Sequence, residues 1–142
     1  MWVQEEATWI EQNFSQARNL LDESIFRNAV HCLSSYRWHA RPSAQLAVLW
    51  SGIEGLFAVE SEIVFRLSLY IARYIAPNDE IERRRVFIEV KHLYKQRSAA
   101  VHGSEIKGDA NSTINESAQL LLRILRQCVT DNNVPCIEKL AP

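Results

Sequence analysis

Two side chains near the end of one long helical stretch could together act on a phosphate diester. Arg97 and His102 lie five positions apart within residues 93–103, Leu-Tyr-Lys-Gln-Arg-Ser-Ala-Ala-Val-His-Gly. A guanidinium can bind a phosphate through two parallel N–H donors, and an imidazole can accept or release a proton near neutral pH. The pair could therefore hold a phosphate and assist attack by the neighbouring 2′-hydroxyl. This chemistry is metal-independent cleavage of RNA, which leaves a 2′,3′-cyclic phosphate and spares DNA.

Four neighbours on the same predicted helix could support this pair: Lys91, Tyr94, Lys95 and Ser98. They would help to bind the phosphate by charge or by hydrogen bonds. The wider stretch holds six cations against the single acid Glu89: Arg83, Arg84, Arg85, Lys91, Lys95 and Arg97. Such an excess could follow a phosphate backbone. A solvated helix face, offset by acids at positions 79, 80 and 82, is the slightly better explanation.

Arg97 falls on the apolar face of its helix when residues are placed at 100° intervals. A buried guanidinium must pair, bind a ligand or reach the rim of the core, because burying it alone is too costly. The ordinary explanation is a carboxylate on a neighbouring helix, and Glu54 or Glu62 could supply it. We therefore expect Glu54, Glu62 and Arg66 as structural partners.

Arg97 and His102 of one chain do not converge on a straight helix, since residues five apart point about 140° from each other. Two chains packed about a two-fold axis would bring both pairs into one cleft. The small residues Ser98, Ala99 and Ala100 would permit close approach. The spacing thus favours a homodimer.

The elements that must position these residues are helices. Only four glycines and four prolines interrupt the chain, and apolar residues recur at helical spacing. We expect helices over residues 2–14, 17–38, 44–59, 62–76, 79–102 and 112–130, with a polar loop over residues 104–111. Ser43 and either Asn78 or Asp79 are expected as N-caps, Gly103 as a helix stop and Pro135 as a barrier to further helix. The sequence predicts one all-α domain over residues 1–142, an up-and-down bundle of about five or six helices, which can be part of a longer chain.

Composition narrows the class of protein. The net charge is −1, so RNA contact would depend on a local patch. The cysteines at positions 32, 128 and 136 form no CxxC pair and no ligand cluster, so we expect no disulfide framework, no metal and no other cofactor. No signal peptide and no membrane-spanning run is apparent, which favours a cytoplasmic protein without membrane contact. The tryptophans are all expected in the core: Trp2, Trp9, Trp38 and Trp50.

Three segments in order resemble the Apea-like branch of the HEPN superfamily. Residues 50–57 resemble its "lE-x-L" helix, residues 61–73 its "s-E-l-x-x-r-l-x-l-r-x-A" helix, and residues 93–103 its "lY-x-x-R-x-x-x-v-H-G" element. The resemblance covers about residues 46–103. It implies a HEPN-like helical bundle, a homodimer and a ribonuclease site in which Arg97 and His102 are the catalytic pair. Ser98 stands where active members commonly have Asn, Asp or His.

The resemblance also implies a biological setting and an alternative. Members are often toxins or defence effectors with an antitoxin or a fused domain. Many others have lost catalysis and act as modules that bind RNA, a nucleotide or a partner protein. A third interpretation is a helical dimerisation domain from a longer protein.

Overall fold

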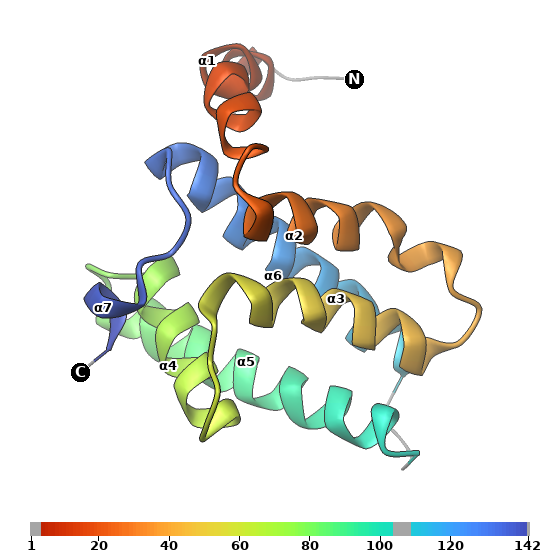
Figure 1. Ribbon diagram of the computed structural model, residues 1–142. Helices are drawn as coiled ribbons and strands as arrows, with labels where there is room; N and C mark the ends of the chain where they lie inside the picture. The colour runs from red at the N-terminus through yellow and green to blue at the C-terminus, as the bar shows by residue number, and fades with distance from the viewer. Residues whose placement is uncertain (1–3, 104–108, 142) are drawn as a thin grey trace.

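The computed structural model describes residues 4–103 and 109–141, apart from the side chains of residues 4–7 and 10–12. This part of the chain is helical and contains no strand, which confirms the predicted all-α helical bundle (Figure 1). In chain order the elements are α1 (Gln4–Leu20), α2 (Ser24–Ser35), the 3-10 helix η1 (Tyr36–Trp38), α3 (Pro42–Phe57), α4 (Ile63–Ile75), α5 (Glu80–Val101), α6 (Ala110–Asp131) and α7 (Ile137–Leu140). Trp2 and most of the expected loop over residues 104–111 lie outside the described residues.

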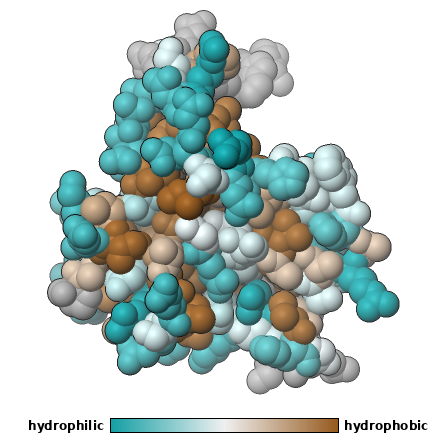
Figure 2. All heavy atoms as spheres, viewed as in Figure 1, coloured by the Kyte–Doolittle hydropathy of each residue, from teal (hydrophilic) through white to brown (hydrophobic). Residues whose placement is uncertain are grey.

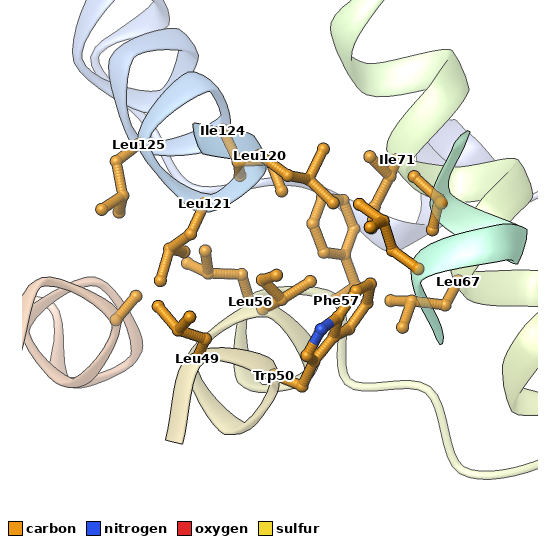
Figure 3. Close-up of a cluster of buried hydrophobic side chains, with 14 of the residues drawn as sticks. Leu49, Trp50, Leu56, Phe57, Leu67, Ile71, Leu120, Leu121, Ile124 and Leu125 are labelled. Atoms are coloured by element: carbon orange, nitrogen blue, oxygen red, sulfur yellow. The ribbon is translucent and has the colours of Figure 1, made fainter. Parts of the chain in front are cut away.

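Helix α3 forms the centre of the bundle. Its apolar stripe is buried almost completely and consists of Leu46, Leu49, Trp50, Ile53, Leu56 and Phe57. Helices α2, α5 and α6 pack around it, and Figure 3 shows its side chains meeting those of α4 and α6. Each fully buried side chain of this size stabilises the fold by about 1.5–3 kcal/mol relative to exposure. The indole N–H of Trp50 donates to Ser117 Oγ at 3.1 Å, so the polar atom of this buried side chain has a hydrogen-bond partner.

Helix α5 begins and ends as the sequence predicts. The side chain of Asp79 accepts a hydrogen bond from the backbone N–H of Glu82 at 3.1 Å and thereby caps the first turn. The last helical residue is Val101, and Gly103 follows with a φ of +80°, a conformation that glycine adopts without strain. Asp79 and Gly103 thus mark the two ends of α5, the helix that carries the predicted site, as the sequence predicts.

Other predicted boundaries are wrong. The first helix continues past Phe14 to Leu20, and the next begins at Ser24 rather than Ala17. No glycine or proline lies between residues 14 and 24, so apolar spacing alone could not locate the turn. Arg41 rather than Ser43 occupies the N-cap of α3, with proline at the start of the helix, where a missing N–H is harmless. Helix α6 likewise starts at Ala110 after an Asp109 cap, two residues before its expected start at position 112.

The prediction that Trp38 lies in the core is also wrong, since its side chain is 82% exposed. The chain changes from α-helix to 3-10 helix at Tyr36, which alters the turn per residue and rotates Trp38 away from the apolar face. Trp50 is fully buried as expected, and Trp9 is half-buried. A single amphipathic helix over residues 17–38 does not exist.

Helices α4 and α5 form an antiparallel hairpin, and the C-terminal helix α7 packs against it. A short α7 follows Pro135, where no helix was expected, and it packs against α4. The Arg73 guanidinium donates to the backbone carbonyl of Leu140 at 2.7 Å.

Glu82 links α5 to α6. Its carboxylate accepts from Arg85 of the same helix at 2.6 Å and from Arg123 of α6 at 2.8 Å. These contacts hold the pKa of Glu82 at about 2, so the bridge stays charged at neutral pH.

The outer surface is mixed in character. On the face shown in Figure 2, apolar atoms form separate islands among polar ones. Helix α1 rises away from the other helices (Figure 1) and meets the bundle mainly through α6, where Arg126 lies 5.7 Å from the Trp9 ring centroid. No helix in the described part of the chain is long and apolar enough to cross a bilayer.

The close approach of α2 and α3 gives a matched pair of glycine substitutions. A Cβ on Gly52 would stand 3.0 Å from Cys32 Cβ and 3.4 Å from the Cα of Ala29, whereas on Gly55 it would meet only the Asn28 amide at 3.9 Å. We expect Gly52→Ala to lower the free energy of unfolding by about 1–3 kcal/mol. Gly55→Ala should raise it by about 0.5–1 kcal/mol through helix propensity. Urea denaturation measures both, and equal effects would contradict the close packing.

Candidate functional site

The C-terminal half of α5 lies against the middle of α3 and carries Arg97. The Trp50 and Tyr94 rings meet edge to face with their centroids 5.5 Å apart. One turn further along α5, Cζ of Arg97 lies 5.2 Å from the Tyr94 ring centroid, within the range of a cation–π contact. The aromatic pair thus fixes the position of the guanidinium relative to the core.

Glu54 approaches the same tyrosine from α3. The pKa of Tyr94 is raised above its usual value, first by burial and next by the negative charge of Glu54, while the positive charge of Arg97 opposes the rise. A hydrogen bond with Glu54 raises this pKa further, and one with Ser98 lowers it. Tyr94 therefore stays protonated at neutral pH, between an acidic and a basic group.

No carboxylate among the described side chains forms an ion pair with Arg97. Among the described residues, none of the ion pairs involves Arg97, and its buried Nε lacks a hydrogen-bond partner. Oε1 of Glu54 is likewise buried without a partner. A buried polar group left unsatisfied costs about 1–3 kcal/mol, so both groups carry unused bonding capacity. Arg97 is half-buried, which leaves part of its side chain accessible to a ligand.

The other two expected structural partners lie elsewhere. Arg66 Nε is 3.6 Å from Glu62 Oε2, one turn apart on α4, and both side chains are largely exposed. An exposed pair of this kind contributes little to stability. Of the three, only Glu54 is brought to the Arg97 cluster, which we define as Glu54, Tyr94, Arg97 and Ser98.

His102 lies immediately beyond the last residue of α5 and is exposed. Its backbone N–H donates to the carbonyl of Ser98 at 3.0 Å, so the chain keeps its helical course up to this residue. Because α5 is continuous from Arg97 to Val101, the two side chains of the pair keep the divergence of about 140° expected of a straight helix. A single chain does not bring them together.

The basic residues of α5 divide into two groups. The three arginines near its start are engaged locally: Arg83 donates to the carbonyls of Ala76 and Pro77, Arg84 pairs with Glu80, and Arg85 pairs with Glu82 and Glu89. Lys91 and Lys95 are exposed and take part in none of the ion pairs among described residues. At helical spacing they share the outer face of α5 with His102. Besides Arg97, the cations of α5 that are available to a phosphate backbone are thus Lys91 and Lys95.

Sequence reasoning missed two clefts because each joins segments far apart in the chain. One of about 640 Å³ lies between α4, the start of α5 and α7, with Arg73, Arg83 and Lys139 in its wall. Another, of about 590 Å³, lies beside η1. Neither is lined by Arg97 or His102. Within the described residues, no three His, Cys, Asp or Glu side chains gather closely enough to hold a metal ion.

A comparison of the chain with family models, curated proteins and solved structures finds no significant match. The family, the chemistry and the partners therefore stay predictions.

The unpaired state of Arg97 can be tested through stability. Methionine at this position would lose the contact with the Tyr94 ring but would remove the unsatisfied Nε, and these effects nearly cancel. We expect Arg97→Met to change the free energy of unfolding by less than about 1 kcal/mol. The matched control is Arg73→Met, which removes a hydrogen bond from a charged donor to Leu140 and should cost about 1.5–3 kcal/mol. Equal losses in urea denaturation would show that Arg97 serves the fold.

Proposed function

We propose that the chain is a metal-independent endoribonuclease of the HEPN type that acts as a homodimer. The observation that carries the proposal is the guanidinium of Arg97, which is fixed on the Tyr94 ring while no described carboxylate neutralises it. A positioned arginine without an ion pair among the described residues, with an exposed histidine five positions later on the same helix, suits a phosphate diester once two copies meet. The HEPN-like motif in residues 93–103 supports the same chemistry.

The proposed reaction divides the work between two residues. Arg97 binds the non-bridging oxygens and stabilises the charge that gathers on the phosphorane. The 2′-oxygen forms a bond to phosphorus while the bond from phosphorus to the 5′-oxygen breaks. His102 of one chain removes the 2′-hydroxyl proton, and His102 of the second copy gives a proton to the leaving 5′-oxygen. The products are a 2′,3′-cyclic phosphate and a free 5′-hydroxyl.

The second copy is required by the divergence of Arg97 and His102 on one helix. The last turn of α5 suits close approach, because Ser98, Ala99 and Ala100 are small and half-buried and Val101 is 40% exposed. A two-fold axis near this turn would place the Arg97 of each chain beside the His102 of the other. We propose Lys91 and Lys95 as contacts to the flanking RNA backbone. A toxin or defence effector, paired with an antitoxin or fused domain in the cytoplasm, is the setting that fits this activity.

A non-catalytic module is the second candidate, and Ser98 is the observation that favours it. Active relatives of the motif commonly carry Asn, Asp or His after the arginine. A serine hydroxyl offers one hydrogen-bond donor there, whereas an asparagine amide offers two. In this version Arg97 binds the phosphate of RNA, a nucleotide or a partner protein without turnover.

An RNA cleavage assay in EDTA tests the first proposal. We expect the wild-type chain to cut single-stranded RNA, to leave 2′,3′-cyclic ends and to spare DNA of the same sequence. His102→Ala should lower the rate by about 10²–10⁴-fold and Arg97→Ala by about 10²–10³-fold. The matched control is His92→Ala, which removes an exposed histidine of the same helix and should cut at the wild-type rate.

Light scattering supplies the second half of this test. The wild-type chain should have twice the mass of one chain at the concentrations where it cuts. Binding of RNA without cleavage, weakened by Arg97→Ala, would establish the non-catalytic candidate instead. Cleavage that survives His102→Ala, or a monomer that cuts at full rate, would refute the proposed mechanism.

A further inference from the structure

An exposed tryptophan stands on the turn between α2 and α3. Trp38 closes η1 and is 82% exposed. A free indole leaves a large apolar surface in water, which costs free energy that burial would recover. His39 follows in extended conformation, and its carbonyl accepts a hydrogen bond from the Gln45 amide at 2.7 Å. The turn that presents the indole is therefore tied down to α3.

The surroundings of Trp38 are positively charged in a chain of net charge −1. Residues 24–53 contain no aspartate or glutamate, but they include Arg27, Arg37 and Arg41. Arg37 and Arg41 are exposed, and neither takes part in an ion pair among the described residues. Cζ of Arg37 lies 5.5 Å from the Tyr36 ring centroid. A local cationic and aromatic patch of this kind attracts a polyanion with unpaired bases.

A groove of about 590 Å³ borders this turn, and amide side chains make up half of its described lining. It runs between η1 and the start of α6, and its polar wall consists of Arg37, Gln45, Asn111, Asn115 and Gln119. Amides both donate and accept, as the edges of nucleobases require. Among the described residues, no carboxylate lines the groove. Glu116 follows Asn115 on α6 and is exposed, but it is not part of the lining. Asp109 caps α6 by accepting from the N–H of Asn111.

The groove lies at the same end of the bundle as the proposed catalytic residues. Asn111 is in the first turn of α6, nine positions after His102. Figure 1 shows η1, the start of α6 and the end of α5 together at the right-hand end of the bundle. One strand of RNA could therefore contact both regions.

We propose that Trp38, Arg37 and the neighbouring amide groove form a binding site for single-stranded RNA, in which a base stacks on the Trp38 indole. The inference rests on the proposed function for its choice of RNA, but it adds a surface that neither the motif nor the catalytic pair includes. Stacking accepts any base, and the amides add contacts to base edges. Duplex RNA would bind less well, since its bases are not free to stack.

Fluorescence anisotropy with a labelled single-stranded RNA tests this site. Methylation of its 2′-hydroxyls prevents cleavage, so binding is measured separately from catalysis. Trp38→Ala should weaken binding roughly 5- to 100-fold, and Trp38→Phe should retain most of it because a ring remains. Arg37→Gln should weaken binding and reduce the slope of log K against log salt by about 0.7. The control is Ile88→Ala, an exposed apolar residue on the outer face of α5, which should bind like wild type.

The outcomes separate this inference from the nuclease proposal. Loss of binding in Trp38→Ala supports the inference, whether or not the wild-type chain cuts RNA. Unchanged affinity in Trp38→Ala, with cleavage intact, overturns the inference and leaves the nuclease proposal standing. If Trp38→Ala instead halves the mass measured by light scattering, the surface is a contact between copies of the chain, and the inference is also overturned.

Discussion

The burial of α3 is the constraint on which the rest of the structure depends. Its apolar stripe faces three helices at once, so none of them can shift without opening the core. Trp50 transmits this constraint outward, because its ring meets Tyr94 edge to face while its N–H is bound by Ser117 of α6. Through one residue, the central helix fixes α5 and α6 together. The position of Arg97 is a consequence of that packing.

The Arg97 cluster holds two of the three buried side-chain polar atoms that lack a hydrogen-bond partner among the described residues. Arg97 and Glu54 each keep one such atom, and the third belongs to Gln16 of α1, whereas the neighbouring Trp50 indole has its partner. Proteins retain such local cost at places where the group has a task other than folding. The charges of Glu54 and Arg97 act on the pKa of Tyr94 in opposite directions, so both groups lie close to this side chain. This arrangement leaves the guanidinium oriented but unneutralised, the state in which it can bind an anion.

The sequence predicted helices well where a chemical signal marks their ends. Asp79 and Gly103 are strong signals, and α5 has the expected limits. The turn before Ser24 has no such signal, and the change to a 3-10 helix at Tyr36 depends on packing that spacing cannot express. For that reason the sequence predicts Trp38 in the core, whereas its side chain is exposed to solvent. The sequence offered Glu54 and Glu62 as alternative partners of Arg97. The approach of Glu54 to Tyr94 depends on the rotation of α3, which sequence spacing does not determine. The η1 groove joins residues 36–45 with residues 111–119, and no local pattern reveals such a pairing.

Helix α1 is attached to the bundle by fewer contacts than the other long helices, so its local stability is lower than that of the core. This helix stands apart from the others and touches chiefly α6, with the Trp9 ring beside Arg126. The remaining helices share one core, whereas Leu20 is the only buried core member among the side chains of α1 that the structure describes. Local opening requires only the free energy of the contacts that are lost. Helix α1 can therefore detach and return while the core stays intact, so its amide protons would exchange with solvent sooner than those of α3.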